Sequence, residues 1–442
     1  MDRQLSLLSP QEEAELFHDH QRSGFFALLV QFPDEKRQSS YRLTDMPAVL
    51  EMVDPTRDTW ISQAEFFRRN RRVVNLSRIG LLFVDLDTYR QPWAQGRTPE
   101  QLASAVLYHC HADGIPAPSL IVFSGRGLQA KWLLDGCLPR AALPRWNACQ
   151  RFLISRLEVL GADPAARDAS RVLRLVNTVN SRSGEICRVV HVENGLDGQP
   201  VRYSFEYMAE MLLPTARWDI EAMKQAQLDR RQLKLLAGNK TGNLRTFNAR
   251  QLAWDRLEDL RKLAEMRGGV NEGERMQHLF WQLNFLLLSG VVHSTQLYHE
   301  AAALARQLDP RWSYSSAELM TLYAKAKAYN AGERVEYGGR MHVPIYTPRN
   351  DTLIDLLQIT PDEQKHLRTI ISKHVAQARD RARQESRRRA AGAMDRESYL
   401  GITCAKRSAA RALSAQGLSI RAIAETMGIS IRSVSNYLSN RS

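Results

Sequence analysis

The chain has 442 residues, an apolar content of 44% and a formal net charge of +13. This length exceeds one ordinary core, so we expect two or three domains, and the apolar content excludes a disordered chain. No run of about 18 apolar residues occurs, and the first residues (MDRQLSLLSPQEEAEL) carry acids where a secretion signal would be apolar. We therefore expect a cytoplasmic protein with no membrane partner.

The basic excess is the first indication of a partner. A large positive charge on a protein of this class favours a polyanion, usually nucleic acid. The five cysteines contain no C-x-x-C pair, which gives neither a zinc-knuckle spacing nor a disulfide framework. Charge alone does not specify any chemistry.

The first half of the chain alternates strand and helix patterns. Apolar runs at residues 24–32, 79–87, 120–125 and 130–134 predict strands, and helical patterns occur around residues 99–113 and 140–160. The third and fourth strands are joined by a Gly-rich turn. We therefore predict an α+β domain with a mixed or antiparallel sheet.

Two acidic residues end the second of these strands. Asp85 and Asp87 are two residues apart in FVDLD, so on a strand their carboxylates leave the same face, about 6.6 Å apart along the chain. Carboxylates placed in this way can hold Mg²⁺ or Mn²⁺, which prefer oxygen ligands and can clamp the oxygens of a phosphoryl transfer. Solvated acids at a strand end are the simpler alternative.

A basic, Gly-rich turn follows in the sequence SGRGLQAKW (residues 124–132). Glycines let a backbone approach a phosphate closely, and Arg126 and Lys131 add positive charge. An ordinary hairpin with two solvated basic residues would show the same pattern.

The segment GADPAARDASRVLRLVNTVNSRSG (residues 161–184) adds more candidates. Asp163 and Asp168 are both candidates for a third metal ligand. Arg171 and Arg174 are three residues apart and would share a face if the segment were helical, so that both could address a triphosphate.

The order of these motifs resembles the archaeo-eukaryotic primase superfamily, and most closely the RepB-type primases of plasmids and mobile elements. The motifs are D-x-D, then S-G-R-G-L-x-x-x-W, then D-P-x(6)-R-x-x-R-L-x-N-T-x-N-x-R-x-G, and the run WISQAEFFRRNRR (residues 60–72) is also similar to that group. Together they cover about residues 20–200. The resemblance implies a primase/RRM-like mixed sheet and a two-metal nucleotidyl transferase that makes primers on single-stranded DNA from NTPs or dNTPs.

The resemblance also implies roles for individual residues. Asp85, Asp87 and Asp163 would bind Mg²⁺ or Mn²⁺, and the family spacing to Arg171 favours Asp163 over Asp168. The residues expected near the incoming nucleotide are Ser124, Arg126, Gln129, Lys131, Arg171, Arg174 and Asn180. Many members of the superfamily have a His where Gln129 stands, whereas RepB-type members resemble this chain in having Gln, which can form hydrogen bonds but adds no charge.

The second half of the chain is predicted to be helical. Residues 274–289, 293–307 and 315–330 have helical spacing, and Thr360, Pro361 and Glu363 form a helix-start signature for a helix running to about residue 391. The middle region faintly resembles the helical domain that follows many such primases; a packing domain without chemistry is the alternative. The predicted domains are residues 1–215 (catalytic), 216–345 (helical), 346–410 (long basic helix and linker) and 411–442.

The last predicted domain resembles a helix-turn-helix. Ala424 is small where two helices would cross, Gly428 can form the turn, and Val434 can pack the second helix on the first. The resemblance implies DNA-binding roles for Arg421, Ser430, Arg432, Ser433 and Asn436, with an origin or other double-stranded DNA as partner.

The sequence therefore favours a primase that starts replication of a plasmid or mobile element, with a replicative helicase as a further expected partner. A non-catalytic replication initiator or regulator that keeps a primase fold is the alternative. The charge and the C-terminal motif fit both hypotheses, and the acids and nucleotide motifs favour the enzyme.

Overall fold

The computed structural model describes residues 7–213, 239–392 and 396–439. Contacts divide the chain into unit 1, which comprises residues up to Ile359 together with His366–Ile370, and unit 2, which comprises Thr360–Lys365 and the residues from Ile371 onward. The boundaries predicted at residues 215/216, 345/346 and 410/411 stay predictions, and the first of them lies outside the described residues.

Unit 1 contains a 10-stranded sheet in which the main strands follow the order β8-β3-β1-β4-β5-β7-β6-β9. β2 pairs with β1, and β10 pairs with β7 as the parallel neighbour in an otherwise antiparallel arrangement. The prediction of an α+β fold with a mixed or antiparallel sheet is confirmed. The strands are β1 (Phe25–Gln31), β2 (Lys36–Arg42), β3 (Thr59–Ser62), β4 (Ala64–Phe66), β5 (Leu76–Leu86), β6 (Leu120–Phe123), β7 (Leu128–Pro139), β8 (Val172–Arg174), β9 (Arg188–Val192) and β10 (Arg202–Tyr203).

The centre of the sheet is the long pair β5–β7. Leu81 to Val84 are fully buried, because this stretch is apolar at every position and is covered on both faces. Helices accompany the strands in unit 1: α1 (Pro10–Glu15), α2 (Met46–Glu51), α3 (Pro99–Ala112), α4 (Leu143–Arg156) and α5 (Phe205–Leu212). The predicted helices at 99–113 and 140–160 correspond to α3 and α4.

Helix α4 secures the edge of β5 that β4 leaves open, because β4 pairs with β5 only as far as Ile79. The Trp146 indole N–H donates to the Leu81 carbonyl at 2.9 Å, and the Gln150 amide hydrogen-bonds both the N–H and the carbonyl of Phe83. These bonds satisfy buried backbone groups that would otherwise cost about 1–3 kcal/mol each. They fix the strand that leads to Asp85.

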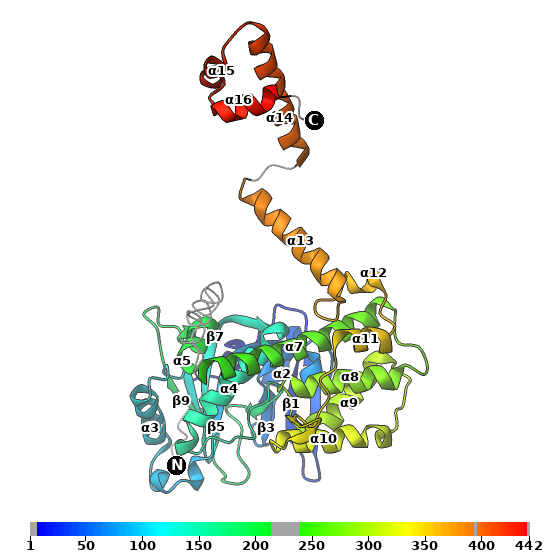
Figure 1. The fold of residues 1–442 in the computed structure, drawn as a ribbon. Helices are drawn as coiled ribbons and strands as arrows, with labels where there is room; N and C mark the ends of the chain where they lie inside the picture. The colour runs from blue at the N-terminus through cyan, green and yellow to red at the C-terminus, as the bar shows by residue number, and fades with distance from the viewer. Residues whose placement is uncertain (1–6, 214–238, 393–395, 440–442) are drawn as a thin grey trace. The chain divides into compact units, whose positions relative to one another are not determined.

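A group of helices completes unit 1 (Figure 1). It comprises α7 (Asn239–Met266), α8 (Arg275–Leu288), α9 (Ser294–Leu308), α10 (Met320–Asn330) and α11 (Asn350–Leu356), with the short hairpin β11 (Val335–Tyr337) and β12 (Arg340–His342). The helices predicted at 274–289, 293–307 and 315–330 correspond to α8, α9 and α10. In Figure 1 the group lies beside the sheet, and α7 packs along α4.

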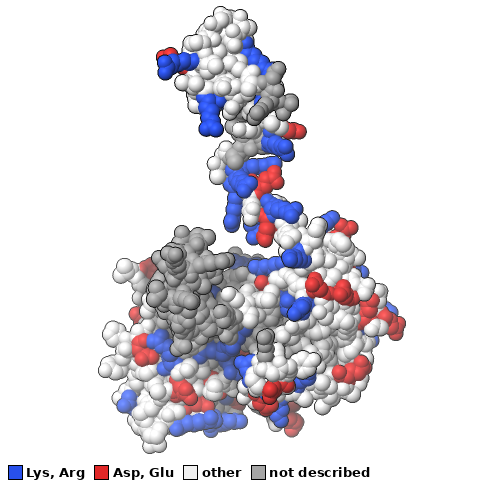
Figure 2. Space-filling view, in the orientation of Figure 1, with Lys and Arg blue, Asp and Glu red and all other residues white. Residues whose placement is uncertain are grey.

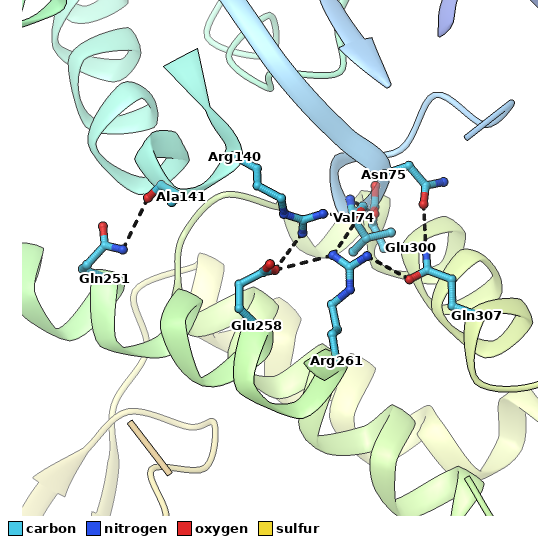
Figure 3. Close-up of polar contacts among 9 residues, drawn as sticks. All are labelled: Val74, Asn75, Arg140, Ala141, Gln251, Glu258, Arg261, Glu300 and Gln307. Carbon is cyan, nitrogen blue, oxygen red and sulfur yellow. Dashed lines mark hydrogen bonds and ion pairs between the residues drawn. The ribbon is translucent and has the colours of Figure 1, made fainter. Parts of the chain in front are cut away.

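Polar contacts join this helical group to the start of β5 (Figure 3). Arg140 and Arg261 both donate to the Val74 carbonyl, at 3.1 and 3.0 Å, and both face the Glu258 carboxylate. The Gln307 amide donates to Asn75 Oδ1 at 2.7 Å. Because Asn75 directly precedes β5, the helical group holds the same strand that carries the acidic pair.

The basic helix predicted from residue 360 to about 391 is wrong as one continuous element. The chain forms α12 (Pro361–Gln364) and then α13 (Lys373–Ala390), with the segment His366–Ile370 between them belonging to unit 1. Leu367 and Ile370 are buried there, and Asp259 of α7 accepts the N–H groups of Thr369 and Ile370 at 2.6 and 2.9 Å. Burial and these bonds outweigh local helix propensity.

Unit 2 continues through α13, α14 (Arg396–Ala415), α15 (Ile420–Met427) and α16 (Ile431–Leu438). Figure 2 shows Lys and Arg along its helices with a few acidic side chains among them. Ala410, Ile423, Ala424 and Val434 form a small core, and Gly428 takes φ of +62° between α15 and α16. A search of the described helices finds none both long and apolar enough for a bilayer crossing.

Candidate functional site

The acidic pair lies at the end of β5 and faces a cavity of about 290 Å³. Backbone pairing fixes the end of the strand, because the Asp87 N–H donates to the Gly161 carbonyl at 2.8 Å. The predicted site residues that line the cavity are Asp85, Asp87, Ser124, Arg126, Gln129, Arg171, Arg174 and Asn180. The fold thus collects residues from β5, β7, β8 and two loops around one opening.

The positive charge near Asp85 and Asp87 does not compensate for the burial and mutual repulsion of the carboxylates. Removal from water raises the pKa of Asp85 to about 6, the negative charges of Asp87 and Asp163 add to the rise, and Arg171 opposes it. Asp87 forms an ion pair with Arg90 at 3.1 Å between Oδ2 and Nη1, in which the arginine is largely exposed. A cation bound between the two carboxylates would remove this penalty.

The Gly-rich turn between β6 and β7 is held against the acidic pair. The Ser124 N–H donates to the Gly127 carbonyl at 2.9 Å. A Cβ on Gly127 would stand 2.3 Å from the Leu86 carbonyl oxygen, and a Cβ on Gly125, which has φ of +89°, would stand 2.5 Å from the Asn180 Cβ. Asn180 also donates to the Ser124 carbonyl at 2.8 Å. Glycine at these two positions is what allows the turn to touch both walls of the cavity.

The arginines that line the cavity come from two segments: Arg126 from the turn between β6 and β7, and Arg171 and Arg174 from the segment that contains β8. Arg126 lies over the Tyr89 ring, 4.2 Å from its centroid, on the side of the turn. Arg174 lies over the Trp60 ring at 4.7 Å and forms an ion pair with Asp58. Both guanidinium groups are held by aromatic faces.

Arg171 and Arg174 are not on a helix, so this part of the sequence-based prediction is corrected. Arg171 directly precedes β8, and Arg174 is its last residue. β8 pairs with β3 as an antiparallel neighbour, and Trp60 of β3 stands opposite Arg174. Both side chains still line the cavity. The pairing of β8 with β3, and not a helical repeat, positions this segment at the cavity.

The two candidates for a third acid lie in different places. The Asp163 N–H donates to the Asp85 carbonyl at 2.8 Å, while its carboxylate accepts from the Ala165 N–H and faces Arg171 at 3.4 Å. Asp168 accepts from the Ser170 N–H and hydroxyl and lines a different cavity. Within the described ranges no three acidic, His or Cys side chains are grouped to hold a metal. Asp163 is the nearer candidate by its backbone, but it is not among the residues that line the cavity.

Lys131 is not brought to the cavity. It is fully buried and forms an ion pair with Glu13 of α1, with Nζ 5.0 Å from the centroid of the Phe17 ring. The sequence-based expectation placed it near the nucleotide because it adds positive charge to the Gly-rich motif and because the primase resemblance implies that role. Lys131 shares a strand face with Gln129, but Glu13 of α1 covers it there, and the lysine is therefore part of the packing.

Gln129 stands directly opposite Asp85 in the β5–β7 pair. Its side chain is 2% exposed, and its Oε1 has no hydrogen-bond partner in the part of the chain that the structure describes. A buried acceptor of this kind costs free energy unless a ligand or a cation satisfies it. This is the strongest local sign that the cavity is shaped for an occupant.

The cavity lining also includes residues that the sequence-based reasoning did not assign to the site, among them Lys36, Asp58, Trp60 and Tyr89. Burial alone would raise the pKa of Asp58, but hydrogen bonds from Ser181 and Arg174, with the charge of Arg174, lower it. Lys36 Nζ lies 4.5 Å from the Trp60 ring centroid. Of these four, only Trp60 fell in a quoted motif; Lys36 begins β2, Asp58 directly precedes β3, and Tyr89 lies in the short turn that follows β5.

The predicted DNA-binding residues lie in unit 2. Arg432 and Asn436 are exposed on α16, and Arg421 is exposed on α15. Ser430 caps α16 by accepting the Ser433 N–H at 3.1 Å, and the two hydroxyl groups lie 2.9 Å apart. Both serines therefore already have a structural task at the start of α16.

Known proteins similar to this chain bear on the same site and fold. No protein-family model matches the chain. The chain is 28% identical over 324 residues to a protein of Clostridium perfringens described as a replication protein, which covers 73% of this chain and 70% of that one.

Solved structures were also compared. The archaeo-eukaryotic primase domain of the Cyanophage S-2L primase-polymerase is 17% identical with a TM-score of 0.32, and covers 46% of this chain and 95% of its own. Primase RepB' is 15% identical with a TM-score of 0.27, and covers 71% and 95%. The RepB' catalytic domain in complex with initiator DNA is 16% identical with a TM-score of 0.27, and covers 48% and 91%. The chain is thus similar in sequence to a replication protein, and the solved structures it resembles are primases and primase-polymerases.

Proposed function

We propose that this chain is a metal-dependent DNA primase or primase-polymerase that synthesises primers on single-stranded DNA when a plasmid or mobile element starts replication. The observation that carries the proposal is the cavity in which Asp85 and Asp87 face Arg126, Arg171 and Arg174. Carboxylates for metal ions and arginines for phosphates are the two requirements of nucleotidyl transfer. The description of the Clostridium perfringens relative as a replication protein supports the same reading.

The residues of the cavity fit Mg²⁺ or Mn²⁺. Asp85, Asp87 and the unpartnered Oε1 of Gln129 all offer oxygen, which these ions prefer. In our proposal Asp85 and Asp87 hold the metal ions, and Asp163 becomes the third ligand when its carboxylate turns from Arg171. Bound there, the ions would stabilise charge on the attacking and leaving oxygens.

The remaining side chains would bind and orient the nucleotide. Arg126, Arg171 and Arg174 line the same cavity as the acidic pair, so their guanidinium groups can contact the phosphates of a nucleotide bound there. Ser124 and Asn180 hold the turn next to the pair. Gln129 can accept a hydrogen bond from the nucleotide where no metal ion engages it.

Primer synthesis tests this proposal. Full-length protein is incubated with single-stranded DNA, labelled NTPs or dNTPs, and Mg²⁺ or Mn²⁺. We expect products that vanish in the Asp85→Ala/Asp87→Ala variant and persist in the charge-matched Glu272→Ala/Glu333→Ala control, whose side chains are exposed. Products that survive loss of the acidic pair contradict the site. If the wild-type protein makes no metal-dependent products, the result favours the non-catalytic initiator instead.

We further propose that unit 2 binds DNA, with a helix-turn-helix formed by α15 and α16 that recruits the enzyme to an origin. Arg432 and Asn436 project from α16, as groove-reading residues must. The arginines of α13 would follow phosphates: Arg379, Arg381, Arg383, Arg387, Arg388 and Arg389. A replicative helicase remains a proposed partner.

The DNA-binding proposal has its own test. Double-stranded oligonucleotides are selected from a random pool by the full chain, and the selected sequence is used in mobility-shift assays. We expect loss of sequence preference in Arg432→Ala/Asn436→Ala and on deletion of residues 413–442. Unchanged binding by the deletion variant would refute a recruiting role.

A further inference from the structure

A second cavity, of about 640 Å³, lies in unit 1 where α4 and the segment after Asp163 meet the helical group. Its walls come from α4, from residues 164–168, from α7, from residues 290–296 at the start of α9, and from the end of α10. Asp168 is the one candidate site residue from the sequence that lies in this lining. It is separate from the acidic cavity, whose lining shares none of its residues.

Three arginines line this second cavity: Arg151 of α4, Arg250 of α7, and Arg167 from the segment that follows Asp163. Burial, together with the charges of Arg250 and Arg167, lowers the pKa of Arg151 to about 10. A Cβ on Gly290 would stand 3.2 Å from Arg250 Nε and 3.5 Å from Arg151 Nη1, so both guanidinium groups crowd one glycine. Like charges gathered in this way are stabilised by an anion.

The arginine cluster is not neutralised by any carboxylate of the described residues. Among the described residues none of the three arginines forms an ion pair with an acid. Asp168 also lines the cavity, but its Oδ1 accepts hydrogen bonds from the Ser170 N–H at 3.1 Å and hydroxyl at 2.6 Å. The lining therefore retains a positive excess.

Two further features point to a ligand. Asn147 is 3% exposed and lines the cavity, and its Oδ1 lacks a hydrogen-bond partner as far as the described chain extends. The 15-residue helix α9 also begins here, with Thr295 and Gln296 in the lining, and the start of a helix carries partial positive charge. The arginines and the helix suit phosphates, and the orphaned acceptor suits a hydroxyl or base N–H.

We propose that this cavity binds the terminal phosphate groups of a nucleoside polyphosphate or of a 5′-phosphorylated DNA end, outside the metal site. The segment between the cavities gives the site a direct connection to the proposed function. Pro164, Ala165 and Arg167 line the second cavity, Asp163 is bonded to Asp85, and Arg171 lines the first cavity. A phosphate held here lies against the same stretch of chain that carries Asp163 and Arg171.

The test measures binding without catalysis. An Asp85→Asn/Asp87→Asn background in EDTA removes the metal site, so the result does not depend on primer synthesis. The probes are inorganic tripolyphosphate, a deoxynucleoside triphosphate, and one oligonucleotide with either a 5′-phosphate or a 5′-hydroxyl, each titrated calorimetrically. In this background we expect measurable tripolyphosphate binding.

Two variants and a matched control locate the site. Arg167→Gln removes a guanidinium group, and Thr295→Glu places a carboxylate at the start of α9, where it favours the helix but repels an anion. We expect each to weaken tripolyphosphate binding about tenfold or more. Arg306→Gln makes the same charge change at an exposed position near the other end of α9 and should leave binding unchanged.

Each outcome decides. Weakening in both variants but not in the control supports the site; equal binding in Thr295→Glu and the background protein overturns it, as does no binding of any probe. Preference for the nucleotide identifies a nucleotide site, and preference for the 5′-phosphorylated over the 5′-hydroxyl oligonucleotide identifies a DNA end.

Discussion

Gln129 lies directly across the β5–β7 pair from Asp85, and its buried Oε1 has no partner within the described residues. The two side chains leave the same face of the sheet, since residues opposite each other in an antiparallel pair point the same way. A pair of this kind, an acid with a raised pKa beside an unsatisfied acceptor, is unfavourable in the empty protein. We interpret it as the cost of a site prepared for a cation or a nucleotide.

Replacing Gln129 by Leu should therefore stabilise the folded protein and impair its nucleotide binding and primer synthesis. Leucine has a similar volume and removes the unpaired acceptor, so we expect the free energy of unfolding to rise by about 1 kcal/mol. Nucleotide affinity and primer synthesis should fall. Denaturant unfolding and a primer assay measure both quantities, and Gln11→Leu on the exposed face of α1 is the control. Full activity in Gln129→Leu would contradict a role for Oε1.

Metal affinity should depend on pH through Asp85. The pKa of this carboxyl is about 6, and a cation binds the deprotonated form. Affinity for Mn²⁺ is therefore expected to be constant above pH 7 and to fall about tenfold per unit below pH 6. Titration of Mn²⁺ at several pH values checks this. Asp87→Asn, which removes a neighbouring negative charge, should move the midpoint to lower pH; an unshifted midpoint would mean that another group controls the affinity.

Gly127→Ala should separate the basic turn from the acidic strand. Its Cβ would stand 2.3 Å from the Leu86 carbonyl oxygen, a contact that only backbone movement can relieve. We expect the KM for nucleotides to rise about tenfold or more, because misplacement of an arginine costs a charge-assisted hydrogen bond. Gly401→Ala in α14 is the control, since its Cβ meets nothing within 4 Å. A normal KM in Gly127→Ala would show that the turn does not position the nucleotide.

Glu300 should make stability depend on pH. This buried residue of α9 accepts the N–H groups of Val73 and Val74 at 3.0 Å each, and burial raises its pKa to about 7 despite those bonds. The folded protein thus holds a proton that the unfolded chain, with a pKa near 4.5, has lost. Between pH 4.5 and 7 the contribution of Glu300 to stability declines as pH rises.

Glu300→Gln should remove that part of the decline. Denaturant midpoints at pH 5, 6 and 7.5 are compared between the wild type, Glu300→Gln and the exposed control Glu333→Gln. Asp85 contributes a slope of the same sign below pH 6 in all three proteins, so it cancels in the comparison, and the difference due to Glu300 is expected to accumulate mainly between pH 5 and 7. Identical slopes in the wild type and Glu300→Gln would exclude a raised pKa at the junction with the helical group.

The local elements could be predicted from the sequence because each depends on nearby residues. The apolar runs of β1, β5, β6 and β7 and the spacing of α8 and α9 are periodic patterns, which short-range backbone geometry converts into strands and helices. The acidic pair was recognisable from its D-x-D pattern after an apolar run, although only Asp85 lies on β5 and Asp87 directly follows the last residue of the strand. Both side chains line the cavity.

What only the tertiary structure decided is which side chains meet. Lys131 has the same strand parity as Gln129, yet α1 covers it with Glu13. Arg171 and Arg174 converge although their segment is a strand, because β8 pairs with β3. The helix predicted from residue 360 is interrupted because Leu367 and Ile370 are buried beside Asp259. In the second cavity Arg151, Arg167 and Arg250 come from three separate segments, and none of them was a predicted site residue. Burial and long-range pairing determine such contacts, and neither can be derived from residue spacing alone.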